Sequence, residues 1–376
     1  MKNKKIVFIT GTRADFGKLK PLIDVVENSN RFDCYIFATG MHTLKKYGQT
    51  YSEIKKQKYK NLFIFENQKN VEHDLILADT IQGFSDFVKK INPDMIIVHG
   101  DRLETLAGAI VGLFNGILVG HVEGGEISGT VDEIIRHSVT KLSHIHFVSN
   151  SEAKKRIIQM GEHKNSSFII GSPEIEVMKS SNIPDIEETK TRYNIQFDNY
   201  AIFIFHPVVT EFHSIEKQIK EIVLGLKHSK KKFIIIYPNN DKGSDIIINE
   251  IKKLRDNKNF KIFPSIRFNY FLSLLKNADF VIGNSSTIVR EAEVFGTPAI
   301  NIGTRQSNRN KSKEITNISW KKLQVTKAIK NVEGIRFKPK SFFYPVKSCS
   351  AEFLKILSGK SAWNRNLQKQ FKDIKI

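Results

Sequence analysis

A regular alternation of short apolar runs with longer amphipathic stretches constrains the fold more than any other feature of the sequence. The runs are rich in Ile, Val and Phe, and stretches such as residues 18–29 and 73–91 between them have the apolar spacing of helices. Strands that are apolar on both faces and separated by helices are typical of a parallel sheet covered by helices on both sides. The predicted strands of the first half are KIVFITG (5–11), DCYIFATG (33–40), NLFIF (61–65), DMIIVHGD (94–101), GILVGHVEG (116–124), HIHFVSN (144–150) and FIIGS (168–172).

The pattern restarts after SSNIPDIEETKTRYN (180–194), a segment that reads as a linker. We therefore predict an α/β protein with two Rossmann-like, doubly wound domains, residues 1–176 and residues 177–350. Ligands of such sheets bind beyond the carboxyl ends of the strands, so we expect the site in a central cleft that the two domains face. The predicted strands of the second half are YAIFIFHPV (200–208), KKFIIIYPN (231–239), FKIFPSI (260–266), DFVIGNSS (279–286) and TPAINIGTR (297–305).

Composition narrows the functional class. No apolar run approaches the roughly 20 residues of a membrane span, and MKNKKIVFITG reads as a first strand rather than a signal peptide. Two distant cysteines, Cys34 and Cys349, favour the reducing cytoplasm. The net charge is +20, but the lysines are scattered in short groups, so we expect no nucleic-acid partner and no integral membrane contact. A basic surface still favours anionic substrates.

Two glycine-containing turns are candidate phosphate sites. GTRADFGK (11–18) fails the P-loop pattern because five residues separate its glycines and Leu19 replaces Ser or Thr. What remains is a strand-to-helix turn with Arg13, which favours an anion over an ordinary surface turn. GNSSTIVRE (283–291) predicts a strand, a turn with Ser285 and Ser286, and a helix, which suits a diphosphate, with Glu291 near a ribose. The simpler interpretation is a serine helix cap.

Carboxylates and histidines gather in HVEGGEISGTVDEIIRH (121–137), directly after an apolar strand. Together with Asp101 at the end of the preceding strand, Glu123 and Asp132 form a set that can divide proton removal and proton donation between its members. A metal site is the alternative, and its ligands would come from four histidines: His121, His137, His144 and His146. Because the sequence has no H-E-x-x-H pattern and no cysteine ligand there, we interpret these histidines as structural and predict no catalytic metal.

Seven segments, read in order along nearly the whole chain, resemble one enzyme family. They are TRADFGKL, GDRLETLAGA, HVEGGEISGTVDEIIRHSVTKLSHIH, FHPVVTE, YPNNDKGSD, GNSSTIVREA and GTPAINIGTRQSNR. The chain is similar to the hydrolysing UDP-N-acetylglucosamine 2-epimerases of bacterial sialic acid and capsule biosynthesis. That resemblance implies a fold of the glycosyltransferase GT-B type, a homodimer, and a C-terminal segment, residues 351–376, that returns to the first domain as helix.

The resemblance also implies the activity: UDP-N-acetylglucosamine and water become N-acetylmannosamine and UDP through 2-acetamidoglucal, with no cofactor and no metal. Asp101, Glu123 and Asp132 match the family's essential carboxylates, and His206 joins the catalytic group because it would stabilise the departing diphosphate. Gly17 stands where some members have Ser. The positions that match residues holding UDP are Arg13, Arg102, His206, Asn239, Ser285, Ser286, Glu291 and Arg305, with Ile266 and Phe271 matching the uracil pocket.

Several alternatives stay open at this stage. The same chemistry could act on a modified 2,4-diacetamido or 6-deoxy sugar nucleotide, and a non-hydrolysing 2-epimerase would recombine the glycal with UDP. GNSS and SGTVDE favour the hydrolysing branch. A GT-B glycosyltransferase has no acceptor-site signal in its favour, and a nucleic-acid-binding or membrane-surface protein would use the +20 charge. Release of free UDP from UDP-N-acetylglucosamine separates all of them.

Overall fold

Two parallel sheets organise the protein. The computed structural model describes residues 3–66, 72–128, 131–180, 183–307, 309, 312–340 and 347–373. The chain forms two compact units: unit 1 contains residues 1–126, 132–179 and 342–376, and unit 2 contains residues 127–131 and 180–341. The predicted boundaries, 1–176, 177–350 and 351–376, stay predictions, while α7 reaches Lys179 within unit 1.

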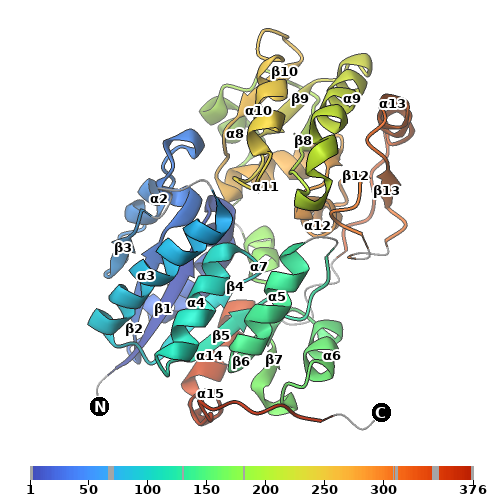
Figure 1. The fold of residues 1–376 in the computed structure, drawn as a ribbon. Helices are drawn as coiled ribbons and strands as arrows, with labels where there is room; N and C mark the ends of the chain where they lie inside the picture. Colours follow the sequence, from blue (N-terminus) through green and yellow to red (C-terminus); the bar gives the residue numbers. More distant parts are fainter. Residues whose placement is uncertain are drawn as a thin grey trace. The chain divides into compact units, whose positions relative to one another are not determined.

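The sheet of unit 1 has seven strands in the order β3-β2-β1-β4-β5-β6-β7, and each strand runs parallel to its neighbours in the sheet (Figure 1). Its strands are β1 (Lys4–Thr10), β2 (Phe32–Ala38), β3 (Leu62–Ile64), β4 (Met95–His99), β5 (Leu118–Val122), β6 (Ile145–Val148) and β7 (Ser167–Ile169). Its helices are α1 (Arg13–Glu27), α2 (Tyr51–Lys56), α3 (His73–Ile91), α4 (Leu103–Phe114), α5 (Val131–Leu142), α6 (Ser151–Gln159), α7 (Pro173–Lys179), α14 (Cys349–Ser358) and α15 (Lys360–Trp363), with 3₁₀ turns η1 (Gly40–Thr43), η2 (Lys45–Tyr47) and η3 (Lys164–Ser166).

The sheet of unit 2 has six parallel strands in the order β10-β9-β8-β11-β12-β13. Its strands are β8 (Ala201–Ile204), β9 (Phe233–Ile236), β10 (Phe260–Phe263), β11 (Val281–Gly283), β12 (Ala299–Ile302) and β13 (Ile315–Ile318). Its helices are α8 (Ile186–Tyr193), α9 (Ile215–His228), α10 (Ser244–Lys252), α11 (Phe268–Asn277), α12 (Glu291–Phe295) and α13 (Lys322–Asn331), with 3₁₀ turns η4 (Val209–Ser214) and η5 (Ser286–Ile288). Two doubly wound sheets confirm the predicted fold class.

Alternating side chains of β1 explain why the strands of unit 1 are apolar on both faces. Ile6 and Phe8 pack with α1 and α14, whereas Val7 and Ile9 pack with α3 and α4 on the opposite face. All four side chains are at most 2% exposed. A sheet covered on both sides leaves only its edges and strand ends for function, which is where the polar residues of the sequence lie.

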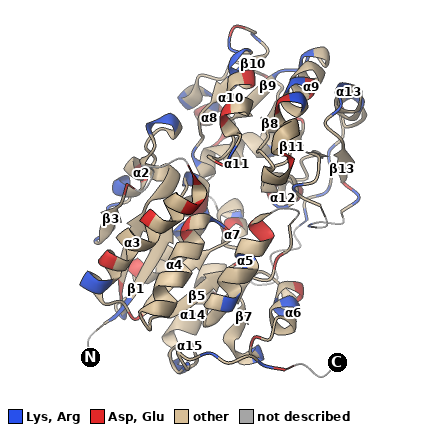
Figure 2. Cartoon of the chain, viewed as in Figure 1, with Lys and Arg blue, Asp and Glu red and all other residues tan. Residues whose placement is uncertain are grey.

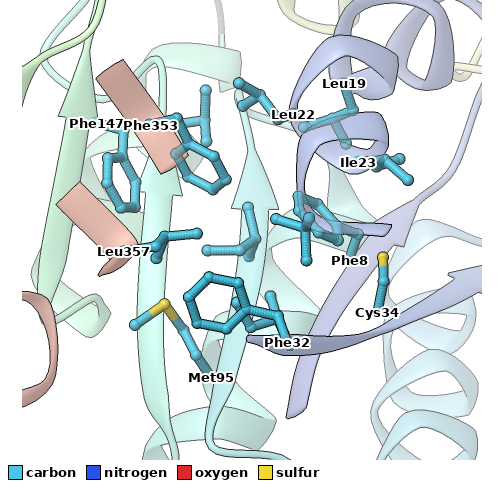
Figure 3. Close-up of a cluster of buried hydrophobic side chains, with 14 of the residues drawn as sticks. Phe8, Leu19, Leu22, Ile23, Phe32, Cys34, Met95, Phe147, Phe353 and Leu357 are labelled. Carbon is cyan, nitrogen blue, oxygen red and sulfur yellow. The ribbon is translucent and has the colours of Figure 1, made fainter. Parts of the chain in front are cut away.

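The C-terminal segment returns to unit 1, but only part of it is helical. Phe353 and Leu357 of α14 insert into the core beside Phe8 and Phe147 (Figure 3), and the Phe353 and Phe147 ring centroids lie 4.7 Å apart. The segment was predicted to return as helix, but its first helix ends at Ser358, because Gly359 follows with extended backbone. A short α15 comes next, and residues 364–373 are neither helix nor strand.

Two other elements of unit 2 differ from the predictions. The segment predicted as a linker contains α8, whose first turn is capped by Asp185 accepting a hydrogen bond from the backbone N–H of Glu188. Tyr270 donates a hydrogen bond to Glu188 (2.8 Å) and so fixes α8 to α11. We predicted no strand at β13, because its four residues include Asn317 and form no continuous apolar run. In the structure, none of the four is fully buried.

Candidate active site

The loops that follow β1 and β4 create the first candidate site. These strands are neighbours although the chain leaves β1 toward β2, so their carboxyl ends form the topological switch point of unit 1. Thr12 caps α1 by accepting a hydrogen bond from the N–H of Asp15. The Asp15 carboxylate in turn accepts hydrogen bonds from Thr10 Oγ1 (2.7 Å) and Gly11 N–H (3.2 Å), which fixes it at the strand end.

A buried imidazole joins Asp15 to a predicted catalytic carboxylate. His99 Nδ1 lies 2.7 Å from Asp15 Oδ1, and His99 Nε2 lies 3.4 Å from Glu123 Oε2. Burial lowers the pKa of His99, but the charge of Glu123 and the hydrogen bond to Asp15 outweigh burial and raise the pKa to about 10. Ser172, after β7, donates a hydrogen bond to Glu123 Oε1 (2.8 Å). A charged imidazolium between two held carboxylates can carry a proton.

Arg136 of α5 is the second organising group of unit 1. Its side chain is 2% exposed, pairs with Asp101, and donates through Nη1 to the backbone oxygen of Glu126 (3.3 Å). Burial lowers the pKa of Arg136, but the charges of Asp101, Glu126, Glu123 and Asp132 outweigh it and keep the group protonated. All three predicted carboxylates therefore act on one buried cation.

His121 holds the loop that carries Asp101. Its Nε2 lies 2.9 Å from the carbonyl oxygen of Gly100, and its Nδ1 lies 3.1 Å from Thr140 Oγ1. The carbonyl oxygen can only accept, so Nε2 carries the proton. Burial lowers the pKa of His121 to about 3, so this imidazole is neutral and positions the loop without adding charge.

The two strand histidines also have structural partners. The N–H of Val119 donates to His144 Nδ1 (3.1 Å), and His146 Nε2 lies 3.1 Å from Glu162 Oε2. Burial lowers the pKa of both imidazoles. These hydrogen bonds agree with our interpretation of His144 and His146 as structural histidines.

A different group could hold a metal ion by distance alone. His99, Glu123 and Glu174 each offer one ligand atom, and these atoms lie within 4.8 Å of one another. Lys18 Nζ lies 3.7 Å from Glu174 Oε2, with Lys18 12% and Glu174 0% exposed. A lysine ammonium and a protonated His99 already supply positive charge at the position that a cation would take. This chemistry fits proton transfer better than metal binding.

Three further predicted positions of unit 1 belong to the same strand ends. Arg13 begins α1 and pairs with Glu53 (2.6 Å), Arg102 precedes α4 with its Nε 3.4 Å from Glu104 Oε2, and Gly17 lies in the second turn of α1. The GTRADFGK segment thus forms the strand-to-helix turn that we predicted. Binding of an anion by these residues stays a prediction.

In unit 2, His206 follows β8 and Asn284 follows β11, at the switch point of that sheet. Asn284 clamps His206 from both sides: its Oδ1 accepts from the N–H of His206 (2.6 Å) and its Nδ2 donates to the carbonyl oxygen of His206 (2.8 Å). The backbone N–H of Asn239 donates to His206 Nδ1 (3.0 Å). Since Nδ1 accepts, the proton of the neutral ring lies on Nε2, which is thereby a defined donor.

The serine turn differs from the predicted helix start. Ser285 Oγ accepts from the N–H of Thr287, but the turn η5 ends at Ile288, and a separate helix of five residues begins at Glu291. Three β-branched residues, Thr287 to Val289, disfavour a continuous α-helix here. The macrodipole of a long helix therefore does not act on Ser285 and Ser286, and an anion would depend on their hydroxyl and N–H groups.

The remaining predicted UDP positions lie in unit 2. Arg305 donates to the carbonyl oxygen of Asn284 (3.3 Å), so it belongs to the same loop cluster as His206. Glu291 is 2% exposed at the start of α12. Ile266 and Phe271 are buried just before and within α11.

Sequence reasoning assigned no role to four groups: Asp15, His99, Lys18 and Arg136. The strand-end rule did point to Asp15, which follows β1, and to His99, which ends β4, but no motif did. Arg136 lies four residues after Asp132 on α5 and therefore on the same helix face. The four-residue spacing from Asp132 was therefore the sequence signal that could have identified Arg136 as a counter-ion of the carboxylates.

Comparisons with known proteins show which family the chain resembles. The family model described as UDP-N-acetylglucosamine 2-epimerase matches residues 24–354. A UDP-N-acetylglucosamine 2-epimerase of Neisseria meningitidis serogroup B is 44% identical over 99% of this chain and 100% of its own length. A hydrolysing UDP-N,N'-diacetylbacillosamine 2-epimerase of Legionella pneumophila is 33% identical over 84% of this chain and 85% of its own length.

A solved structure supports the fold. The UDP-GlcNAc 2-epimerase of Methanocaldococcus jannaschii, in complex with UDP-GlcNAc and UDP, has a TM-score of 0.76 and 23% identity, covering 94% of this chain and 99% of that one. Across the described residues, no helix combines the length and apolar character needed to cross a bilayer. A match over most of the chain, together with 44% identity to a relative of equal extent, leaves one conclusion: the chain belongs to the UDP-N-acetylglucosamine 2-epimerase family.

Proposed function

We propose that the protein is a hydrolysing 2-epimerase that converts UDP-N-acetylglucosamine and water into N-acetylmannosamine and UDP. The observation that carries the proposal is the placement of Asp101, Glu123 and Asp132 around one buried guanidinium, Arg136. The charge of the guanidinium offsets the repulsion between the carboxylates, so the folded protein can hold several of them near one another. It also suits a reaction that consists of proton transfers.

The proposed reaction has two halves. The C1–O bond to UDP breaks and leaves positive charge at C1, which acidifies the hydrogen at C2. A carboxylate removes that proton, and the products are 2-acetamidoglucal and UDP. Water then adds its hydroxyl at C1, and a proton reaches C2 from the opposite face, which gives the manno sugar.

The surroundings of the carboxylates suggest separate roles. Asp101 pairs with Arg136, and its carboxylate can stabilise positive charge at C1. Glu123 contacts the protonated His99 and can exchange a proton through it. Asp132, half-buried in the first turn of α5, would serve the second proton transfer.

Unit 2 would hold UDP in this proposal. The Nε2–H of His206 and the hydroxyls of Ser285 and Ser286 can donate to the diphosphate, with Arg305 nearby in the same loop cluster. Ser285 Oγ accepts from the N–H of Thr287 and donates to Thr287 Oγ1, both over 3.4 Å, so an anion would replace only one long hydrogen bond of this hydroxyl. Changing both serines to alanine should cost about 1.5–3 kcal/mol of UDP affinity per lost bond to a charged group. Unchanged affinity in a UDP titration would place the diphosphate elsewhere.

Turnover in deuterated water tests the reaction. We expect free UDP and N-acetylmannosamine with deuterium at C2 by nuclear magnetic resonance. Formation of UDP-N-acetylmannosamine without free UDP would show the non-hydrolysing reaction, and full retention of the C2 hydrogen would refute the elimination route.

Side-chain changes and a chelator test the machinery. Asp101→Asn, Glu123→Gln and Asp132→Asn should each lower kcat about 10²–10⁴-fold, the usual contribution of a placed acid or base. Glu133→Gln is the matched control, because Glu133 pairs with His137 on the same helix. EDTA should leave kcat unchanged, and restoration of activity by a divalent metal after EDTA would overturn the proposed chemistry.

The sugar and the setting complete the proposal. The Legionella relative acts, by its name, on UDP-N,N'-diacetylbacillosamine, so kcat/KM for that nucleotide and for UDP-N-acetylglucosamine should be compared. We propose that kcat/KM is higher for UDP-N-acetylglucosamine and that the product enters sialic acid biosynthesis.

We also propose a cytoplasmic homodimer. Both cysteines are buried free thiols, which fits a reducing compartment, and sedimentation equilibrium tests the dimer.

A further inference from the structure

A basic pocket lies in unit 1, away from every residue assigned to the reaction. It is open to solvent, has a volume of about 540 Å³, and is formed where the start of β7 meets α6, η3 and α15. That volume falls in the range of small-molecule sites, roughly 300–1,000 Å³. Among the described residues that line it, none is acidic, and four are cationic: Lys154, Lys164, Lys360 and Arg365.

The pocket is at the opposite end of the sheet from the candidate active site. Ser167 and Phe168, which line it, begin β7, whereas Ser172, which contacts Glu123, follows the carboxyl end of that strand. Figure 2 shows Lys and Arg at α15 and beside the lower end of β7. A ligand here would not compete with substrate for the catalytic carboxylates.

Two of the cations are held in place by the backbone. Lys154 Nζ donates to the carbonyl oxygen of Ser167 (2.6 Å), and Arg365 Nη2 donates to that of Asn165 (2.6 Å). Burial, and to a smaller extent the charge of the neighbouring Lys164, lower the pKa of Lys154. In the described part of the chain, none of the four cations forms an ion pair.

Polar atoms without partners mark the same place. Ser167 is 1% exposed, yet within the described residues its Oγ has no hydrogen-bond partner, and neither has the buried Nε of Arg365. Buried polar atoms are nearly always hydrogen-bonded in native proteins. Both groups can donate, so an acceptor-rich ligand would satisfy them.

We propose that this pocket binds a small phosphate-bearing anion. Four cations and neutral donors suit a phosphate ester, whose oxygens accept several bonds at once. Stacking of a nucleobase would contribute little, because the Phe168 ring already has the Arg365 guanidinium 5.8 Å from its centroid and stacks on Phe147. Recognition therefore rests on the phosphate group.

Hydrogen–deuterium exchange on the full chain, with pyrophosphate as the probe, tests the proposal locally. We expect saturable protection of peptides covering residues 160–168 and 359–366. Lys164→Gln with Lys360→Gln, both exposed, should weaken this protection about five- to twenty-fold, since each exposed ion pair contributes up to about fivefold. The matched control, Lys56→Gln with Lys258→Gln, removes the same charge from exposed positions elsewhere and should bind as the unchanged protein does.

Ser167→Ala separates a ligand contact from a structural role. It should weaken pyrophosphate protection about tenfold or more, as for a bond to a charged group, without lowering Tm, because no described partner of Ser167 Oγ is lost. Absence of protection, equal weakening in the Lys56/Lys258 control, or preferential binding of an oligonucleotide through the same lysines would each overturn the proposal. None of these results depends on epimerase activity.

Discussion

Replacing Arg136 by methionine tests whether this buried cation holds the carboxylates of unit 1 together. Arg136 is 2% exposed and its partner Asp101 is 24% exposed. Removing one member of a buried pair costs about 3–5 kcal/mol because the other charge stays behind. Since Asp101 keeps some contact with water, we expect the lower end, about 3 kcal/mol. For a unit of roughly 200 residues that corresponds to a fall in Tm of about 6–12 °C.

The assay is urea denaturation of four proteins: the unchanged chain, Arg136→Met, Asp101→Asn and the double variant. Because the neutral amide no longer leaves an uncompensated charge, Asp101→Asn in the Arg136→Met background should restore about 1–3 kcal/mol. Arg156→Met is the control, since Arg156 donates to the carbonyl oxygen of Gly125 and has no carboxylate partner in the described structure; it should cost about 1 kcal/mol. A coupling energy below about 0.5 kcal/mol would refute the reasoning.

Three further changes test other parts of the structure. His99 has a raised pKa, so the stabilisation that its charged form provides is complete below pH 6.5 and is lost as the pH rises toward 10. The unfolding free energy of the unchanged protein should therefore fall between these pH values, and His99→Gln should flatten that fall. An equal fall in both proteins would contradict this. Gly283→Ala should cost at least about 2 kcal/mol in thermal denaturation and weaken UDP binding, because at φ +142° its Cβ would lie 1.8 Å from the Ile204 carbonyl oxygen. Phe353→Ala should cost about 3–5 kcal/mol in urea denaturation and accelerate proteolysis within residues 359–373; an unchanged cleavage rate would mean that the ring against Phe147 does not anchor the segment.

The strands of both units could be predicted because their signal is local. An Ile-, Val- and Phe-rich run that must be buried on both faces is visible in the run itself, and α3 begins and ends at the residues of the predicted amphipathic stretch. The elements that differed depend on context. Tyr270 is 82 residues from the Glu188 that it binds, so the sequence around α8 gives no sign of that contact.

The candidate site shows the same division. Asp101, Glu123 and Asp132 were predicted from strand ends and from family resemblance, and their catalytic roles stay predictions. Asp15 lies in the first turn of α1, His99 ends β4 and Glu123 follows β5, so their contacts join three separate elements, and Asp15 and His99 are 84 positions apart in the sequence. Two residues of the SGTVDE segment that favours the hydrolysing branch, Gly129 and Thr130, lie outside the described residues.

Charge balance explains why an acid-rich strand end can be buried in unit 1. Carboxylates this close repel one another and would bind protons or a cation if nothing opposed their charge. The protein supplies three cations of its own there: protonated His99, Arg136 of α5 and Lys18 of α1. A proton that moves between Glu123 and His99 leaves the total charge of the cluster unchanged, and the Arg136 guanidinium and Lys18 ammonium offset the negative charge of the carboxylates beside them. Proton transfer within this cluster therefore has a small electrostatic cost, which suits the elimination and hydration that we propose.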